Sequence, residues 1–343
     1  MAKRRNEKNE RIKRDYLYYR KHAKQCSAKT LDREIATLER FDVWNGRKDF
    51  ARFHIKWAMQ FRTYLEQAKS AHGKPFSKST QRAIMATLRD FTIWLSQQDG
   101  FRRRIRLEHA EYFRLSLRDE AEARAAPETP APSVRQAKRA LELMPETTPR
   151  EMRDKALVSL LCLCGPRVAA IATLRIKHVD LDEKCVKQNP REVATKFGKP
   201  IDSFFHKGFS EAALARWMIY LDEVALYGPD DPLFPATAIS AKGTEGFKAT
   251  GFERRHWSTT VPIRKIVNAA FKAAGLEPYG PHSFRHMHSR HISRHCKNIP
   301  ELVAASQNLG HSDVLMTLKH YGQISREEQR RLITGQEREE SDD

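Results

Sequence analysis

The sequence lacks the features of membrane proteins, secreted proteins and zinc ribbons. It has no run of about 18 apolar residues, so no membrane-spanning helix is expected. Its charged beginning, MAKRRNEKNERIKRDY, contains no apolar core and is not expected to be a secretory signal. Cysteine is scarce, odd in number and without C-x-x-C spacing: Cys26, Cys162, Cys164, Cys185 and Cys296. This usage favours a reducing cytosol over a disulfide scaffold or a zinc ribbon.

The first third of the chain has few acidic residues for its number of basic ones. The 343 residues suffice for two domains and carry a net charge of +19. Residues 1–110 hold 27 Lys and Arg against 12 Asp and Glu, a net of +15, whereas the other 233 residues hold 35 against 31. Surfaces that serve solubility mix both signs, so an excess of this size favours a polyanionic partner. The charge therefore predicts binding to nucleic acid.

The first half of the chain has a helical pattern that ends in a proline-rich segment. Apolar residues recur at helical spacing, as in Leu31, Ile35, Leu38 and Phe41, and the aromatic stripes are expected in a core. The run RRRIR adds a basic patch through Arg102, Arg103 and Arg104. Proline stiffens a chain and removes backbone donors, so the Ala-, Pro- and Glu-rich stretch predicts an exposed linker. The predicted segments are a basic tail at 1–28, a helical domain at 29–117 and the linker at 118–133.

The second half mixes helical patterns with one β pattern. Ser133 with Gln136, and Thr148 with Glu151, have the spacing of capping boxes and predict two helices. β-forming residues around a Phe197-Gly198 turn predict a hairpin. The hydrophobic pattern predicts strands at about 184–206 and helices at 211–226, 261–274, 283–295, 299–308 and 312–320. The second domain is predicted at 134–336, and an acidic tail at 337–343. The fold class is therefore expected to be mainly α with a small antiparallel β-sheet.

The second domain contains the groups needed to cleave a phosphodiester without a metal. Such cleavage needs a nucleophile, cations around the non-bridging oxygens and a proton donor for the leaving oxygen. The candidates are Arg167, Lys196, His282, Arg285, His311 and Tyr321. Taken singly, each has an ordinary alternative: a surface arginine at a helix start, a turn lysine, a chance H-x-x-R pair or a core tyrosine. Arginine suits the cationic role because its planar fork can donate two hydrogen bonds to one phosphate.

Five histidines lie between residues 282 and 295, and they raise the question of a metal. The pairs 282/286 and 291/295 have i,i+4 spacing, which two ligands of one metal can have. Neither pair has the glutamate of H-E-x-x-H, and no Cys or Asp cluster accompanies them. No metal site is therefore predicted, and surface or phosphate-facing histidines are the expectation.

In order and spacing, these motifs resemble the tyrosine recombinases, also called phage-type integrases. GPRVAAIATLRIKHVDLD resembles the family's first arginine box and would make Arg167 its arginine. PHSFRHMHSRHI resembles the H-x-x-R box of His282 and Arg285. LGHSDVLMTLKHYGQI resembles the final box, with His311 and the nucleophile Tyr321. The resemblance covers roughly residues 134–330.

At two positions the match to the family is incomplete. ATKFGKPI resembles the hairpin that carries the family's lysine. By its position before the turn, Lys196 matches that lysine, and Lys199 is the alternative. If Lys196 is the catalytic lysine, Lys199 is expected to contact DNA. Many members have Glu or Asp three residues after the first arginine, where this chain has Ala170. That acid is thought to orient neighbouring groups, so its absence either weakens the site or is offset by another residue.

The resemblance implies a two-domain DNA clamp, in which a helical core-binding domain accompanies an α+β catalytic domain. Tyr321 would attack the scissile phosphate and form a 3′-phosphotyrosyl link, with no metal, ATP or other cofactor. The two arginines and His311 would bind the phosphate, Lys196 would protonate the leaving 5′-oxygen, and His282 would assist proton transfer. The implied partners are duplex DNA with specific recombination sites and a homo-tetramer on two such sites, with accessory DNA-bending proteins left open and no membrane. The implied location is the cytoplasm, at the nucleoid when bound to DNA.

Other functions stay open on the sequence. A relaxing type IB topoisomerase or a hairpin-forming resolvase would use the same tyrosine. A non-catalytic architectural DNA-binding protein would explain the charge, and Ala170 leaves room for it. A metal-dependent nuclease would use the histidines instead.

Overall fold

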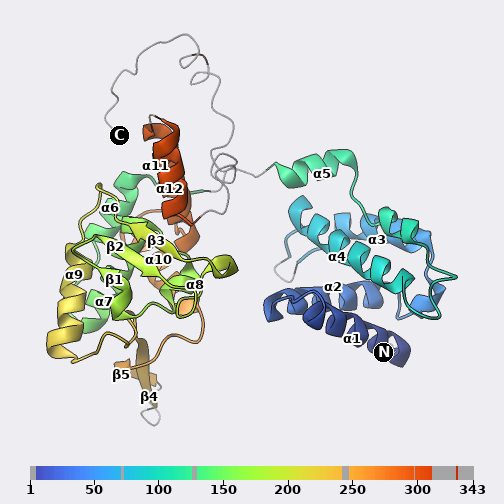
Figure 1. Ribbon diagram of the computed structural model, residues 1–343, viewed down its shortest axis with the longest axis horizontal. Coiled ribbons are helices and arrows are strands. Elements are labelled where there is room, and N and C mark those ends of the chain that lie inside the picture. The colour runs from blue at the N-terminus through green and yellow to red at the C-terminus, as the bar shows by residue number, and fades with distance from the viewer. Residues whose placement is uncertain are drawn as a thin grey trace. The chain divides into compact units, whose positions relative to one another are not determined.

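The chain forms two mainly helical units. The computed structural model describes residues 5–70, 73–125, 130–241, 247–296, 298–310 and 330, leaving aside the side chains of 197, 240, 241, 247–250 and 293–295. Unit 1 is Met1–Pro127 and unit 2 is Glu128–Asp343. The strands β1 to β5 all belong to unit 2 (Figure 1). The expected fold class, mainly α with small antiparallel sheets, is confirmed. In the described ranges, no helix is long and apolar enough to cross a membrane.

Unit 1 is a helical unit with an aromatic core. Its helices are α1 (Glu7–His22), α2 (Ala28–Trp44), α3 (Ile55–Gln67), α4 (Lys78–Ser96) and α5 (Leu117–Arg124), with 3-10 turns at Phe50–Arg52 and Leu107–Tyr112. The aromatic stripes of the sequence lie in this core, as expected: Phe41, Phe61 and Phe91 are almost fully buried. Phe41 contacts Phe61 edge to face, with ring centroids 5.0 Å apart. Such rings bury a large apolar area, and they hold α2, α3 and α4 together.

Helix α1 corrects the prediction of a basic tail at residues 1–28. Asn6 caps it by accepting hydrogen bonds from the amides of Lys8 and Asn9, and Tyr16 is fully buried against Phe91 and Trp94. The hydrophobic periodicity of α1 is weak, because polar side chains occupy much of its buried face. Lys13 is buried there with its ammonium 2.7 Å from both Glu10 and Glu39 and 3.1 Å from Asp42.

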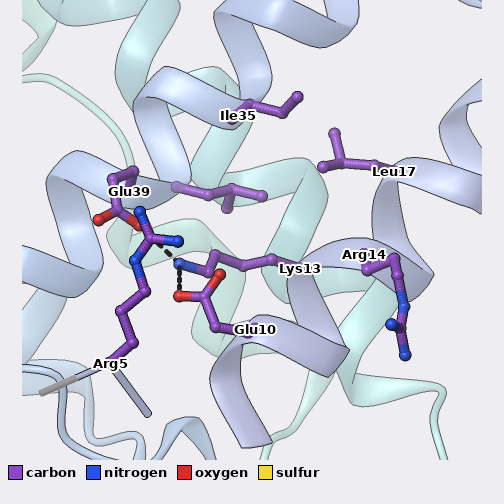
Figure 2. A pocket seen from close by; sticks show the side chains of 8 residues that line it. Arg5, Glu10, Lys13, Arg14, Leu17, Ile35 and Glu39 are labelled. Carbon is purple, nitrogen blue, oxygen red and sulfur yellow. Dashed lines mark hydrogen bonds and ion pairs between the residues drawn. The ribbon is translucent and has the colours of Figure 1, made fainter. Parts of the chain in front are cut away.

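Figure 2 shows Lys13 between Glu10 and Glu39 on the wall of a cavity of about 340 Å³. The three carboxylates are close enough together to hold a cation, and the Lys13 ammonium already occupies that position. Burial by itself would lower the pKa of Lys13, but the hydrogen bonds that its ammonium donates to the three carboxylates outweigh burial, and the pKa is raised. The cluster is therefore a compensated ion network that joins α1 to α2.

The predicted linker at 118–133 begins with a helix. Ser116 caps α5 by accepting a hydrogen bond from the amide of Asp119, and Lys78 of α4 pairs with Asp119 at 2.8 Å. Helix α5 buries none of its residues. It is attached to unit 1 mainly through charge.

Unit 2 is built around α7 (Pro149–Cys164), whose residues 156–164 are all buried. A helix that is apolar on every side belongs at the centre of a fold. Around it lie α6 (Val134–Glu142), α8 (Val168–Ile171), α9 (Ala212–Ile219) with a π-helical turn at Tyr220–Val224, α10 (Val261–Ala273), α11 (Pro281–His295) and α12 (Ile299–Asn308). The two predicted capping boxes are confirmed: Ser133 with Gln136 opens α6, and Thr148 with Glu151 opens α7.

The predicted hairpin is part of a three-stranded antiparallel sheet. Its strands are β1 (Val179–Asp180), β2 (Cys185–Gln188) and β3 (Ile201–Phe204), in the order β1-β2-β3. Val186 pairs with Ser203, and Lys187 with Asp202. The connection between β2 and β3 includes the expected Phe197-Gly198 turn, where Gly198 has φ +62°.

A second hairpin was not predicted. Strands β4 (Ala236–Ala241) and β5 (Phe247–Glu253) extend from the body of unit 2 (Figure 1). Its base is fixed by the buried Arg153 of α7, which lies over the rings of Phe252 and Trp257 and donates to the carbonyl of Pro235. Small residues such as Ala, Thr and Ser give β4 no strong strand pattern, so its pairing depends on this anchor.

We expect Lys13→Met to lower the free energy of unfolding by about 3 kcal/mol, because it removes the nearest cation from the buried Asp42 carboxylate and leaves that carboxylate with Arg47 at 3.5 Å. The matched control is Lys8→Met on the same helix, whose side chain is 79% exposed and lies 3.9 Å from Asp49. The control should cost less than about 1 kcal/mol. Urea unfolding followed by tryptophan fluorescence measures both, and equal costs would contradict a buried ion network.

Candidate active site

The first predicted arginine follows the end of the central helix. Helix α7 ends at Gly165, which has φ +55° and donates its amide to the carbonyl of Leu161. A left-handed residue at this position is typical of a helix C-terminus and turns the chain sharply. Pro166 follows, and Arg167 is the N-terminal flanking residue of the short helix α8. The turn places a half-buried Arg167 beside the C-terminal end of α7.

The H-x-x-R pair lies at the start of α11. Gly280 and Pro281 open this helix, and His282 is exposed in its first turn with its ring 4.8 Å from that of His286. Arg285 lies one turn later and is only 6% exposed. The spacing of three residues therefore separates an exposed imidazole from a buried guanidinium.

The two arginines converge on the main chain that leads into the final motif. Arg285 donates from Nη1 to the carbonyl of Gly165 at 3.0 Å and from Nη2 to the carbonyl of Leu309. Arg167 donates from Nη2 to the carbonyl of Gly310 at 3.2 Å. Residues far apart in the sequence thus meet at the first two residues of the LGHSD motif. His311 and Tyr321, the remaining predicted residues of that box, lie outside the described residues.

The charges of these two arginines are not neutralised by acids in the described part of the chain. Within that part, their hydrogen bonds all go to main-chain oxygens. Burial lowers the pKa of Arg167, and burial followed by the charge of Arg167 lowers the pKa of Arg285 to about 9. Like charges that are withdrawn from water repel each other, and a bound anion would relieve that repulsion. The arrangement is therefore suited to hold an anion.

The predicted lysines lie in the connection between β2 and β3. Lys196 begins a 3-10 turn (Lys196–Gly198), and both Lys196 and Lys199 are exposed. The chain before this turn is held in place: Val193 is buried, and the Glu192 carboxylate lies 2.6 Å from the Lys177 ammonium and 3.0 Å from Nε2 of His178. The turn is therefore presented from a fixed base, and the geometry does not choose between the two lysines.

His288 is buried, which corrects the expectation of a surface or phosphate-facing histidine at this position. It lies one turn after Arg285, is 2% exposed, and its Nε2 lies 3.1 Å from the carbonyl of Leu161. Burial and then the neighbouring His206 lower the pKa of His288 to about 3, so the ring is neutral at neutral pH and donates to that carbonyl. A Cβ built on Gly165 would lie 2.7 Å from Cδ2 of His288, so the ring packs directly on the glycine. In the sequence, the glycine that follows α7 is the one signal of this close approach.

The histidines of α11 do not assemble a metal centre among the described residues. Ring contacts of 5.0 Å join His206 to His288 and His206 to His291. The described histidines do not bring three ligand atoms within 4.8 Å of one another; the acidic cluster around Lys13 is the group that does. The side chain of His295 is not described.

The remaining predicted positions are on surfaces or in the core. Arg102, Arg103 and Arg104 are exposed in unit 1, and Arg102 donates to the carbonyl of Gln97 at 2.9 Å. Ala170 is fully buried in the apolar core of unit 2. Its carbonyl accepts hydrogen bonds from the amide of Thr173 at 2.9 Å and from the Thr173 hydroxyl at 3.1 Å. A methyl group thus lies where the resemblance places an acid.

The sequence of this chain matches a family and several curated proteins. Residues 133–328 match the model of the phage integrase family. The chain is 27% identical over 314 residues to the tyrosine recombinase XerC of Xanthomonas campestris pv. campestris (strain B100), covering 88% of this chain and 81% of that protein. It is 27% identical over 177 residues to tyrosine recombinase XerC of Corynebacterium glutamicum, covering 51% of this chain and 47% of that protein. It is 28% identical over 179 residues to tyrosine recombinase XerD of Neisseria meningitidis serogroup B, covering 50% and 52%. The chain spans about half the length of the last two.

Solved structures share the fold. The XerH site-specific recombinase, bound to a palindromic difH substrate in a post-cleavage complex, matches with a TM-score of 0.63 and 14% identity, covering 92% of this chain and 82% of that chain. A lambda integrase dimer bound to a COC′ core site matches with a TM-score of 0.57 and 15% identity, covering 92% and 96%. At these identities the likeness shows the fold alone.

We expect Gly165→Ala to lower the free energy of unfolding by about 3 kcal/mol, from backbone strain at positive φ plus overpacking against His288. Gly275→Ala is the matched control, because Gly275 has φ +70° with nothing within 4 Å of its built Cβ, and it should cost about 1 kcal/mol. Urea unfolding of both variants measures the difference. Costs within about 0.5 kcal/mol of each other would contradict the close packing of His288 on Gly165.

Proposed function

The chain belongs to the phage integrase family, as its motifs indicated, and we propose that it is a site-specific DNA recombinase. In this proposal it breaks and rejoins DNA strands through a 3′-phosphotyrosyl intermediate and needs neither metal nor ATP. The observation that carries the proposal is a pair of arginines, Arg285 buried and Arg167 half-buried, that meet at Leu309 and Gly310 with no acidic partner among the described residues. Two arginines placed in this way can bind a phosphodiester through parallel hydrogen bonds. The motif residue His311 follows Gly310 directly, and Tyr321 comes ten residues after His311.

The reaction begins with attack of the Tyr321 oxygen on the scissile phosphorus. A bond from this oxygen to phosphorus forms while the bond from phosphorus to the 5′-oxygen breaks. Arg167 and Arg285 bind the non-bridging oxygens, where negative charge grows in the transition state. A free tyrosine has a pKa of about 10, so His282 assists removal of its proton. His311 donates a hydrogen bond to the phosphate.

The leaving 5′-oxygen takes a proton from Lys196, which places the lysine on the opposite side of the phosphorus from the tyrosine. The phosphotyrosyl bond retains the free energy of the phosphodiester, so a 5′-hydroxyl can reverse the step without an energy source. When that hydroxyl comes from a second duplex, the strands are exchanged. The exchange calls for several protomers, proposed as a tetramer on two DNA sites, and the basic residues of unit 1, such as Arg102 to Arg104, add phosphate contacts.

We expect a covalent protein–DNA adduct to form in EDTA. The substrate is a pool of nicked duplexes with randomised sequence on both sides of the nick, because loss of the short nicked strand traps the covalent complex. Adducts are recovered in SDS and their DNA is sequenced. Tyr321→Phe should abolish the adduct, whereas Tyr279→Phe, a matched control packed on Phe271 with ring centroids 5.0 Å apart, should retain it.

Each other result identifies a rival. An adduct that persists in Tyr321→Phe overturns the assignment of the nucleophile. Salt-sensitive DNA binding without any adduct indicates a non-catalytic DNA-binding protein. Nicking that EDTA abolishes indicates a metal-dependent nuclease. Relaxation of supercoiled DNA that contains a single site, without exchange between paired sites, indicates a topoisomerase.

The role of Lys196 predicts a specific rescue. A 5′-bridging phosphorothioate leaves as a thiolate and does not need the proton. On ordinary DNA, Lys196→Ala should slow cleavage by about 10²- to 10⁴-fold, and on the phosphorothioate by much less. Lys199→Ala is the matched control three residues away. Rescue of Lys199→Ala instead of Lys196→Ala, measured by single-turnover cleavage of a duplex selected above, would transfer the role to Lys199.

A further inference from the structure

The loop that leads to Lys196 is tied by a single hydroxyl to the segment that follows Arg167. Thr173 lies two residues after α8, and its Oγ1 accepts a hydrogen bond from the amide of Ala194 at 2.9 Å. Ala194 comes two residues before Lys196. We infer that Thr173 is a positioning residue, which fixes the lysine turn relative to the arginine that binds the phosphate. The inference rests on the proposed role of Lys196 as the proton donor.

The hydroxyl of Thr173 uses both its donor and its acceptor capacity. It donates toward the carbonyls of Ala170 at 3.1 Å and Ala169 at 3.3 Å, and its lone pair receives the Ala194 amide. A hydroxyl whose proton is directed to one partner has its lone pairs oriented for the other. The last turn of α8 and the approach to Lys196 thus share one hydrogen-bonded group.

A second contact comes from the same segment. Lys177 and His178 hold the Glu192 carboxylate at 2.6 and 3.0 Å, and Nδ1 of His178 accepts the Arg175 amide at 2.9 Å. The hydrogen bond from Lys177 lowers the pKa of Glu192, so this carboxylate is ionised at neutral pH. Thr173 and the Lys177–His178 pair therefore hold the loop at two points, and both points follow Arg167 in the chain.

These contacts of the lysine loop matter because Ala170 stands where the resemblance places an acid. The side chain at this position is a buried methyl, which can orient no neighbouring group. The carbonyl of the same residue receives the Thr173 amide and hydroxyl instead. In this chain, the main chain of Ala170 and the side chain of Thr173 fix the position of the lysine loop relative to the segment that carries Arg167.

The experiment compares Thr173→Val with Thr173→Ser. Valine has the shape of threonine without the hydroxyl, and serine keeps the hydroxyl. Thr173→Val should slow single-turnover cleavage of the selected ordinary duplex by about 10-fold, because a displaced proton donor is a poor one. On the 5′-bridging phosphorothioate the same variant should stay within about twofold of the wild type, and Thr173→Ser should stay close to the wild type on both substrates.

Two controls separate this role from a structural one. Thr237→Val removes another hydroxyl of unit 2, one that accepts a hydrogen bond from Arg153 at 2.9 Å, and it should affect both substrates equally. Affinity for uncleaved DNA should not change in Thr173→Val. If this variant unfolds, Glu192→Gln weakens the second contact in its place and should show the same selective loss on ordinary DNA.

The outcomes separate this inference from the proposed function. If Lys196→Ala shows no rescue by the phosphorothioate, the proposed role of Lys196 fails, and the inference fails with it. If Lys196→Ala is rescued but Thr173→Val is slowed equally on both substrates, Thr173 does not act through the lysine. Selective rescue of both variants establishes the coupling.

Discussion

The arrangement of the candidate site depends on holding one buried and one half-buried guanidinium without a carboxylate partner among the described residues. Taking a charge out of water costs several kcal/mol unless hydrogen bonds or opposite charge compensate it. Here the compensation comes from main-chain oxygens of Gly165, Leu309 and Gly310, which belong to distant parts of the chain. The need to present these carbonyls explains the left-handed end of α7, the packing of His288 on it and the close approach of residues 309 and 310.

The two units treat buried charge in opposite ways. Unit 1 encloses Lys13 with three carboxylates, so its internal charge is satisfied and its excess basic charge remains on the surface. Unit 2 leaves Arg167 and Arg285 with neutral acceptors, so part of their charge remains available to a ligand. A satisfied network stabilises a fold, whereas an uncompensated pair stabilises a complex with an anion. The difference fits the proposed function, in which unit 1 adds phosphate contacts and unit 2 binds the scissile phosphate.

Helix α7 and its C-terminal turn order the rest of the candidate site. The apolar helix fixes Gly165, the turn fixes Arg167, and Arg285 and His288 reach back to Gly165 and Leu161 from α11. The lysine loop joins this group through Thr173 and Glu192. Small hydrogen-bonded contacts of this kind decide relative positions within the apolar core, because apolar contacts alone do not fix direction.

Periodicity and capping chemistry are local, so the sequence by itself determined helices α2 to α4, α6, α7 and α9 to α12, the capping boxes of α6 and α7, and the β2–β3 hairpin. The order of the motifs likewise determined the family and the arginines, since each motif is a short continuous run. Helix α1 was missed because Asn9 and Lys13 occupy buried positions that only partners on other segments make favourable. The β4–β5 hairpin was missed because it depends on Arg153 of a distant helix. His288 and Thr173 carry no local pattern, and their contacts lie 127 and 21 residues away in the chain. Only the tertiary structure decided such pairings, because a hydrogen bond depends on where two groups meet in space and not on their neighbours in sequence.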